Sequence, residues 1–167
     1  LASHIVDCPH STPKWTDSGK ICVRTTAFNP FFLDLSEQKF VSEETYINRN
    51  QRLTPIEGDI LYSREGAICG IACQVPKNIE LCLGQRMVVI RAGDEIDKDF
   101  LTMVLNSHHI LTILKELTIG SAAPRVNMKT IRSYPIPTPS IEEQIEIVRR
   151  VEELFAFADQ IEQQVKN

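Results

Sequence analysis

Residues 134–143 read Tyr-Pro-Ile-Pro-Thr-Pro-Ser-Ile-Glu-Glu, and this stretch divides the chain into two parts of different character. Its three prolines at alternate positions fix φ and remove backbone donors, which predicts a semi-rigid extended connector. Ser140 follows at once, and Glu143 comes three residues later, which is the spacing of a capping box. The stretch therefore predicts that an extended connector is followed by a helix that begins at Ile141.

The sequence from Ile141 onward has the spacing of a long amphipathic helix of about 25 residues, which would extend roughly 40 Å. Apolar residues recur every three or four positions, and charged residues occupy the opposite side. Because such a helix is longer than a small domain, we expect its outer half to pack against a partner helix. The alternative is an ordinary amphipathic helix folded back on the rest of the chain. The residues expected at the helix-partner interface are Ile145, Val148, Val151, Phe155, Ala158, Ile161 and Val165.

Before the connector, short strand-like and helix-like segments alternate with turns. The spacing of apolar residues over 99–117 predicts a helix, which Asn106 and Ser107 break into two pieces. Ser42 is placed to cap another short helix. We therefore predict an α+β fold with a curved, twisted β-sheet and short helices. Strands are expected at residues 21–26, 60–63, 68–75 and 86–91.

The predicted organisation is one domain over residues 1–139, including the connector at 135–139, followed by a helical segment at 140–167. Charge follows the same division. Seven acidic and three basic side chains follow residue 140, which accounts for the whole formal net charge of −4 and leaves the preceding residues neutral. Within that neutral part, residues 115–132 hold a local excess of basic side chains. A neutral body with such a patch can bind a polyanion.

Composition excludes several classes of protein. No apolar run approaches 18 residues, and Leu1–Ile5 lack the pattern of a signal peptide, so we expect a cytoplasmic protein that does not span a membrane. The chain does not begin with Met, which suggests a fragment or an engineered start. We interpret the five cysteines as small buried apolar residues of a reducing compartment. The alternative, a metal site with Cys69, Cys73 and Cys82, to which Cys8 and His10 could be added, lacks a second close-spaced pair, so we expect no metal and no cofactor.

The sequence lacks three local signatures that are typical of enzymes. It has no glycine-rich phosphate loop, no pair of histidines on one helix face and no nucleophile elbow. Paired carboxylates such as Glu142 and Glu143 are adjacent, so on a helix they diverge instead of converging on one substrate. We therefore expect a protein that is not itself catalytic.

Three segments, in order along the chain, resemble the specificity subunits of type I restriction–modification enzymes. The first is Gly58-Asp59-Ile60-Leu61-Tyr62-Ser63-Arg64-Glu65-Gly66, and the second is Leu83-Gly84-Gln85-Arg86. The third runs from Ile131 to Gln144 and contains the proline connector and the start of the helix. Each is weak alone, but their order, with the connector and a long helix, is specific.

The resemblance implies a target-recognition domain that reads one half of a bipartite DNA site, joined to a spacer helix. It implies double-stranded DNA and methyltransferase subunits as partners, and restriction–translocase subunits through the complex, which would be the adenine-DNA methyltransferase and endonuclease. The family alternates two such domains with two antiparallel helices, whereas this sequence has one of each. Two arrangements are open: a piece of a longer subunit, or a half-subunit that pairs as a homodimer. A helix-mediated scaffold without independent DNA affinity is the alternative function.

DNA contacts require side chains that pair with base edges or phosphates, and three loop-like segments supply them. Each has a structural alternative: Arg64 could form a salt bridge, and Asn127 could cap a turn. We expect Gln85, Arg86 and Trp15 to be structural, with Trp15 in the core. The candidate DNA-binding residues are Arg24, Thr25, Thr26, Ser63, Arg64, Ser121, Arg125, Asn127 and Lys129.

Overall fold

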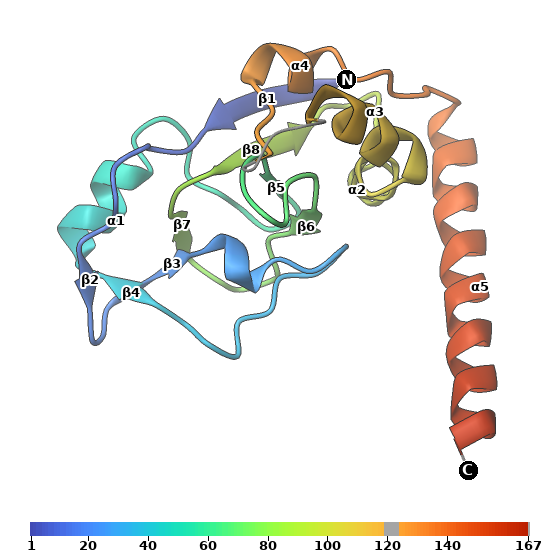
Figure 1. Cartoon of the computed structure of the whole chain (residues 1–167), viewed down its shortest axis with the longest axis horizontal. Helices are drawn as coiled ribbons and strands as arrows, with labels where there is room; N and C mark the ends of the chain where they lie inside the picture. The colour runs from blue at the N-terminus through green and yellow to red at the C-terminus, as the bar shows by residue number, and fades with distance from the viewer. Residues whose placement is uncertain (119–123, 167) are drawn as a thin grey trace.

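A computed structural model describes residues 1–118 and 124–166 and has the α+β architecture that the sequence predicts (Figure 1). One sheet is antiparallel throughout, with strands in the order β1-β8-β5-β6. The second has the order β2-β4-β3-β7, and its β3 and β7 run parallel. The strands are β1 (Ala2–Asp7), β2 (Trp15–Thr16), β3 (Lys20–Val23), β4 (Phe40–Val41), β5 (Ile60–Ser63), β6 (Ala72–Gln74), β7 (Leu81–Leu83) and β8 (Met87–Ala92).

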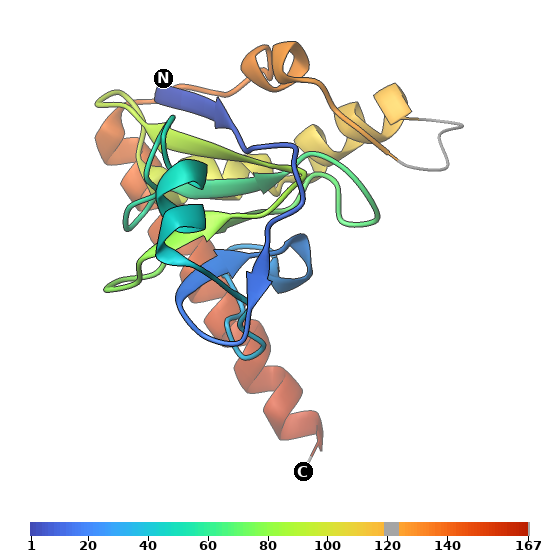
Figure 2. The same cartoon turned by 90° about the vertical axis from the view of Figure 1, so that its left-hand side faces the viewer.

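Short helices connect and cover the sheets, and one long helix ends the chain (Figures 1 and 2). The predicted break at Asn106 and Ser107 separates α2 from α3, and Ser42 caps α1 by accepting a hydrogen bond from the backbone of Thr45. None of the described helices is long and apolar enough to cross a membrane. The helices are η1 (Thr25–Ala27), α1 (Glu43–Arg49), α2 (Lys98–Leu105), α3 (His108–Thr118), α4 (Met128–Arg132) and α5 (Ile141–Lys166).

The two larger apolar clusters of the body lie on opposite faces of β5 and β8, which are buried on both faces. On one face, Ile60, Tyr62 and Ile90 pack against residues of α2, α3 and α4. On the other, Leu61 and Val89 pack against Leu81 and neighbours from the second sheet. Alternate residues of one strand therefore belong to different clusters, as the two-residue period of a β-strand requires.

Two predicted strands are shorter than their sequence pattern suggests. The run at 21–26 leaves the sheet after Val23 and turns into η1, since its parallel partner β7 ends at Leu83. The run at 68–75 pairs only over Ala72–Gln74. Its first part is a turn in which Gly70 has a φ of +101°, a conformation open to glycine. The first difference places the candidates Thr25 and Thr26 in a short 3-10 helix instead of a strand.

Candidate nucleic-acid interface and helix surface

Ser63 and Arg64 lie inside the body, which corrects their prediction as DNA contacts. Ser63 is fully buried, and Arg64 is 3% exposed. The Arg64 guanidinium donates to both carboxylate oxygens of Asp7, at 2.9 and 3.0 Å. It also donates to the carbonyl oxygen of Val126, at 3.4 Å. Arg64 is therefore a structural residue that joins β1, β5 and the segment before α4, and neither side chain can reach DNA from this position.

The motif that contains Arg64 is structural elsewhere as well. Asp59 is 2% exposed and accepts two hydrogen bonds from Arg91, each at 2.8 Å. Tyr62 is fully buried, and its hydroxyl lies 2.8 Å from that of Tyr134, immediately before the proline connector. Burial and the neighbouring hydroxyl raise the pKa of Tyr62, so this phenol stays protonated. Through the contact between Tyr62 and Tyr134, the motif therefore holds the start of the proline connector against the sheet.

Arg24, Thr25 and Thr26 lie at the surface, where they line a hollow of about 280 Å³. Arg24 has no ion pair or side-chain hydrogen bond among the residues that the structure describes. Trp15, expected in the core, is 41% exposed and lines the same hollow. Its strand, β2, has two residues at the edge of the second sheet, away from the buried clusters of the body. The remaining lining residues are Thr12, Pro13, Gly84, Gln85 and Arg86.

Arg86 connects this hollow to Arg125. The carboxylate of Glu65 lies 3.7 Å from Nε of Arg86 and 3.6 Å from Nε of Arg125, and both arginine side chains are more than half exposed. Segments far apart in the sequence thus contribute to one surface. The sequence predicts that Gln85 and Arg86 are structural because they precede a strand. Gln85 is half-buried and donates to the carbonyl of His10, as a structural residue would, whereas the charged Arg86 at the strand entry is exposed. We define the reading face as Trp15, Arg24, Thr25, Thr26, Gln85, Arg86 and Arg125.

The remaining candidates lie on or near α4 or outside the described residues. Asn127 caps α4, since its side-chain oxygen accepts from the backbone N–H of Thr130 at 2.9 Å. This is the structural alternative considered for Asn127, and it occupies the oxygen but not the amide nitrogen. Lys129 is exposed on α4. Ser121 falls in residues 119–123, which lie outside the described part of the chain.

The first turns of α5 are attached to the body. Ser140 and Glu143 form the predicted capping box, in which each side chain accepts from the other residue's backbone N–H. Gln144 is fully buried, accepts from the backbone N–H of Asp97 at 2.8 Å and donates to the carbonyls of Glu95 and Pro139. The side chain of Gln144 thus binds α5 to the backbone of Glu95 and Asp97, directly before α2. Sequence reasoning missed Gln144, which follows the capping box directly.

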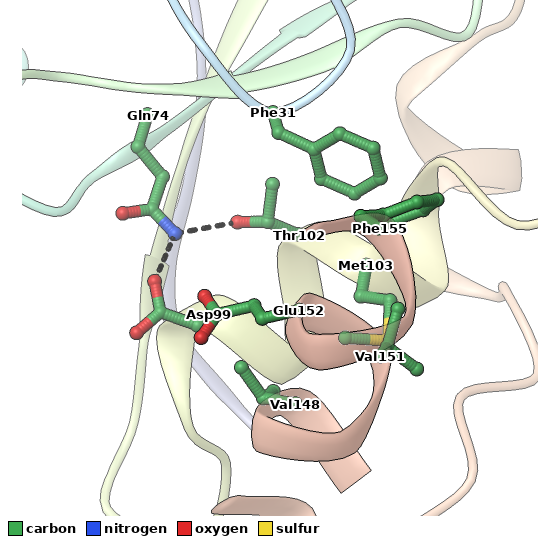
Figure 3. A pocket seen from close by; sticks show the side chains of 9 residues that line it. All are labelled: Phe31, Gln74, Asp99, Thr102, Met103, Val148, Val151, Glu152 and Phe155. Atoms are coloured by element: carbon green, nitrogen blue, oxygen red, sulfur yellow. Dashed lines mark hydrogen bonds between the residues drawn. The ribbon is translucent and has the colours of Figure 1, made fainter. Parts of the chain in front are cut away.

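Further along α5, a hollow of about 320 Å³ lies between α5, α2, Gln74 of β6 and Phe31 of the segment between η1 and β4 (Figure 3). Val148 and Val151 face it from α5, and Phe155 stands beside Phe31 with ring centroids 6.1 Å apart. Gln74 lies opposite and donates to Asp99 and Thr102, at 2.8 and 2.9 Å. The hollow marks where α5 begins to separate from the body.

Beyond this hollow, α5 is exposed on every side. Of the predicted partner-interface residues, Val148 and Val151 are half-buried against the body, and the other five are exposed. Leu154 and Phe157 are also exposed, at 66% and 60%. The sequence already predicts that Leu154 broadens the apolar face, and Phe157 adds to it beyond the predicted stripe. Figures 1 and 2 show this half running past the body toward the C-terminus.

The cysteines have the character of buried apolar residues. Burial raises the pKa of Cys69 to about 11 and that of Cys73 to about 12, so both thiols are protonated at neutral pH. The described residues contain no group of three or more histidine, cysteine or acidic side chains placed to hold a metal ion. The alternative of a cysteine metal site therefore has no support from the geometry.

Comparison with known proteins supplies the family. Residues 12–167 match the family model described as the type I restriction modification DNA specificity domain. The EcoBI specificity subunit of Escherichia coli is 35% identical over 146 residues, which cover 87% of this chain and 30% of that protein. The EcoDI specificity subunit of Escherichia coli is 59% identical over 75 residues, or 45% of this chain and 17% of that protein. The chain therefore spans less than a third of the length of these relatives.

Solved structures give the same fold. The HsdS subunit from Thermoanaerobacter tengcongensis superposes with a TM-score of 0.59 at 22% identity, covering 97% of this chain and 35% of that one. A chain from a study of complex assembly and conformational transition of the type I R-M system superposes with a TM-score of 0.60 at 23% identity, covering 96% and 36%. The resemblance inferred from the three sequence segments is thereby confirmed, and the chain belongs to the type I restriction–modification DNA specificity family.

Proposed function

We propose that this chain recognises one half of a bipartite DNA target within a type I restriction–modification complex. In this proposal, residues 1–139 form the recognition domain and residues 140–167 form the spacer helix. The observation that carries it is the reading face, in which side chains from distant segments meet at one surface of a family member. The chain would contribute recognition and no catalysis, with modification and cleavage carried out by other subunits.

The reading face contains the chemistry that DNA recognition needs. Arginine binds phosphate and, in the major groove, guanine; threonine hydroxyls and glutamine amides pair with base edges or phosphates. The Trp15 ring adds a flat apolar surface beside these polar groups. Lys129 and the amide nitrogen of Asn127 remain available on α4 as additional contacts. Ser63 and Arg64 are no longer part of the proposed set, because they are buried.

The exposed outer half of α5 supports a role in assembly. Phe155, Phe157 and Ile161 expose large apolar surfaces that a second helix would cover. We infer that α5 pairs with another spacer helix, within a longer subunit or across a homodimer, and that methyltransferase subunits dock on this frame. Restriction subunits would join through the methyltransferase.

Duplex binding separates DNA recognition from the alternative of a scaffold without DNA affinity. The reversals Arg125→Glu and Lys129→Glu should each weaken binding to a labelled duplex at low salt, because phosphate contacts dominate affinity there. Lys77→Glu is a matched control, since Lys77 lies beside Gly58 and Lys98, in a hollow that the reading face does not line. Equal loss in the control, or no loss in either reversal, would contradict a DNA role for this region.

Association tests the helix. Replacing Phe155 and Ile161 with Asp should abolish self-association or methyltransferase docking while the body stays folded, since both side chains are about half exposed. The measurements are the mass by light scattering and co-purification with the methyltransferase subunit. Asp159→Ala is a control on the same helix, where an exposed charge is removed. Unchanged mass and unchanged docking in the double variant would contradict the proposed role of α5.

A further inference from the structure

Glu65 lies between two arginines that have no closer partner among the described residues. Its carboxylate oxygens are 3.7 Å from Nε of Arg86 and 3.6 Å from Nε of Arg125. The arginine side chains are 57% and 59% exposed, whereas Glu65 is 27% exposed. The trio carries a net charge of +1 and has two guanidinium groups directed toward one anion.

The backbone builds this arrangement before any ligand binds. Glu65 and Arg125 form an antiparallel bridge, and Gly66 donates to the carbonyl of Pro124 at 2.9 Å. On the other side, the N–H of Arg64 donates to the carbonyl of Arg86 at 3.0 Å. Three chain segments are thus fixed next to each other, and Figure 2 shows the loop after β5 beside the segment that leads to α4. The two arginines are therefore positioned by hydrogen bonds of their own backbones and their neighbours' backbones.

Arg86 adopts a backbone conformation that arginine rarely takes. Its φ is +69°, in the left-handed region where a Cβ is unfavourable and glycine is the usual residue. A glycine at position 86 would adopt this φ with a lower conformational free energy. A non-glycine residue held in this region suggests that its side chain has a use, and backbone strain of this kind concentrates at functional sites.

Comparison with Arg64 shows that Glu65 does not use the hydrogen-bond donors of Arg86 and Arg125. Arg64 donates to both oxygens of Asp7 at 2.9 and 3.0 Å, which is hydrogen-bonding distance. The contacts of Glu65 at 3.6 and 3.7 Å are too long for hydrogen bonds. In the described structure, the N–H groups of Arg86 and Arg125 therefore remain available for a stronger acceptor.

We propose that Arg86 and Arg125 form a clamp for one phosphodiester group of the DNA backbone, and that Glu65 restrains it. Guanidinium groups bind phosphate through paired hydrogen bonds. The Glu65 carboxylate occupies the position of the phosphate in the free protein and orients both arginines toward it. Because Glu65 repels a bound phosphate, it lowers affinity for duplexes that offer only backbone contacts. The clamp deepens the proposed function and depends on it.

The experiment measures the affinity of the full chain for a labelled random-sequence duplex over a range of salt concentrations. Arg86→Gln and Arg125→Gln should weaken binding, and each should reduce the slope of log affinity against log salt by about 1. Glu65→Gln should instead tighten binding by about fivefold, which corresponds to a lost repulsion between unit charges about 4 Å apart in water. Arg86→Gly should weaken binding without lowering the thermal midpoint of unfolding, because glycine relieves the backbone strain.

The pair Glu57–Lys77, separated by 3.8 Å at the surface, supplies matched controls. Glu57→Gln and Lys77→Gln change the net charge equally but should leave affinity within about twofold of wild type. The clamp is overturned if wild-type binding is intact and the Glu65 and arginine variants match these controls. It is also overturned if Glu65→Gln weakens binding together with the arginine variants, which would indicate a structural role. If the wild type binds no duplex, the proposed DNA function fails and the clamp fails with it.

Discussion

The body and α5 use the same kinds of interaction with opposite degrees of burial. In the body, an arginine–carboxylate pair, Arg64 with Asp7, is enclosed by protein. On α5, Glu146 pairs with Arg149 and Arg150 at 2.8 and 2.7 Å, but all three side chains are substantially exposed. Apolar residues follow the same division, since those of β5 are fully buried and those after Leu154 face solvent.

This difference separates two kinds of surface. The body buries the apolar side chains of its central strands and gives its buried charged groups hydrogen-bond partners, as for Arg64, Asp59 and Arg49. The helix satisfies its backbone and caps its first turn, yet exposes most of its apolar surface. Changes in the body should therefore affect unfolding, whereas changes in the outer helix should affect association.

The largest expected loss of stability comes from breaking the buried pair. Arg64→Ala removes three donors from the interior and leaves Asp7 with His10 as its other ion-pair partner, at 3.1 Å. We expect the free energy of unfolding to fall by about 3 kcal/mol, because the mostly buried Asp7 carboxylate loses both of its hydrogen bonds from Arg64. Urea denaturation followed by circular dichroism measures this. A loss no larger than that of Arg125→Ala, an exposed arginine, would show that burial of Arg64 has little effect.

A smaller loss should follow at the junction between the two regions. Gln144→Ala removes hydrogen bonds to Asp97, Glu95 and Pro139 from a fully buried position. We expect about 2 kcal/mol less stability, together with faster amide exchange in the first turns of α5. Gln160→Ala, at an exposed position of the same helix, should change neither. Equal exchange rates in wild type and Gln144→Ala would mean that another contact holds α5 to the body.

The capping box should contribute less to the free energy of unfolding than Gln144 does. Ser140→Ala removes the acceptor for the N–H of Glu143 at the exposed start of α5. A lost N-cap costs about 1 kcal/mol, which should appear as lower stability and reduced helix content. Thr138→Ala is a matched control two residues earlier, in the extended connector. If both substitutions have the same effect, the cap does not set the start of the helix.

The sequence predicted the structural features that depend on neighbouring residues. It did not predict those that depend on contacts between residues far apart in the chain. The capping box at Ser140 and the break at Asn106 are local features, and the structure confirms both. The burial of Arg64 depends on Asp7, more than fifty positions earlier, so no spacing rule could reveal it. Trp15 lies on a two-residue strand at a sheet edge and not in the core, and that position becomes known only with the strand order.

The candidate DNA-binding residues show the same limit. Arg24 and Arg125 were each identified by residue type in a loop-like segment. The sequence could not predict that Glu65 and Arg86 link these residues into one surface. That link follows from backbone pairing between segments about 20 and 60 residues apart. The left-handed φ of Arg86 has no sequence signal, because the position carries arginine where glycine would have indicated it.

The smallest expected effect concerns the exposed ion pairs of α5, and it should depend on pH. Hydrogen bonds from Arg149 and Arg150 lower the pKa of Glu146 to about 2, from an ordinary value of 4.5. Because this pKa is lower in the folded state, the stabilisation is complete above about pH 4.5 and is lost as the pH falls toward 2. The stability difference between wild type and Glu146→Gln should therefore shrink over that range, and also in high salt at neutral pH. Glu142→Gln, at a position without an ion pair in the described structure, should show no comparable pH dependence. A difference that persists unchanged at pH 2 would mean that Glu146 acts by packing or helix propensity, and the contrast with the buried Arg64–Asp7 pair would then not be electrostatic.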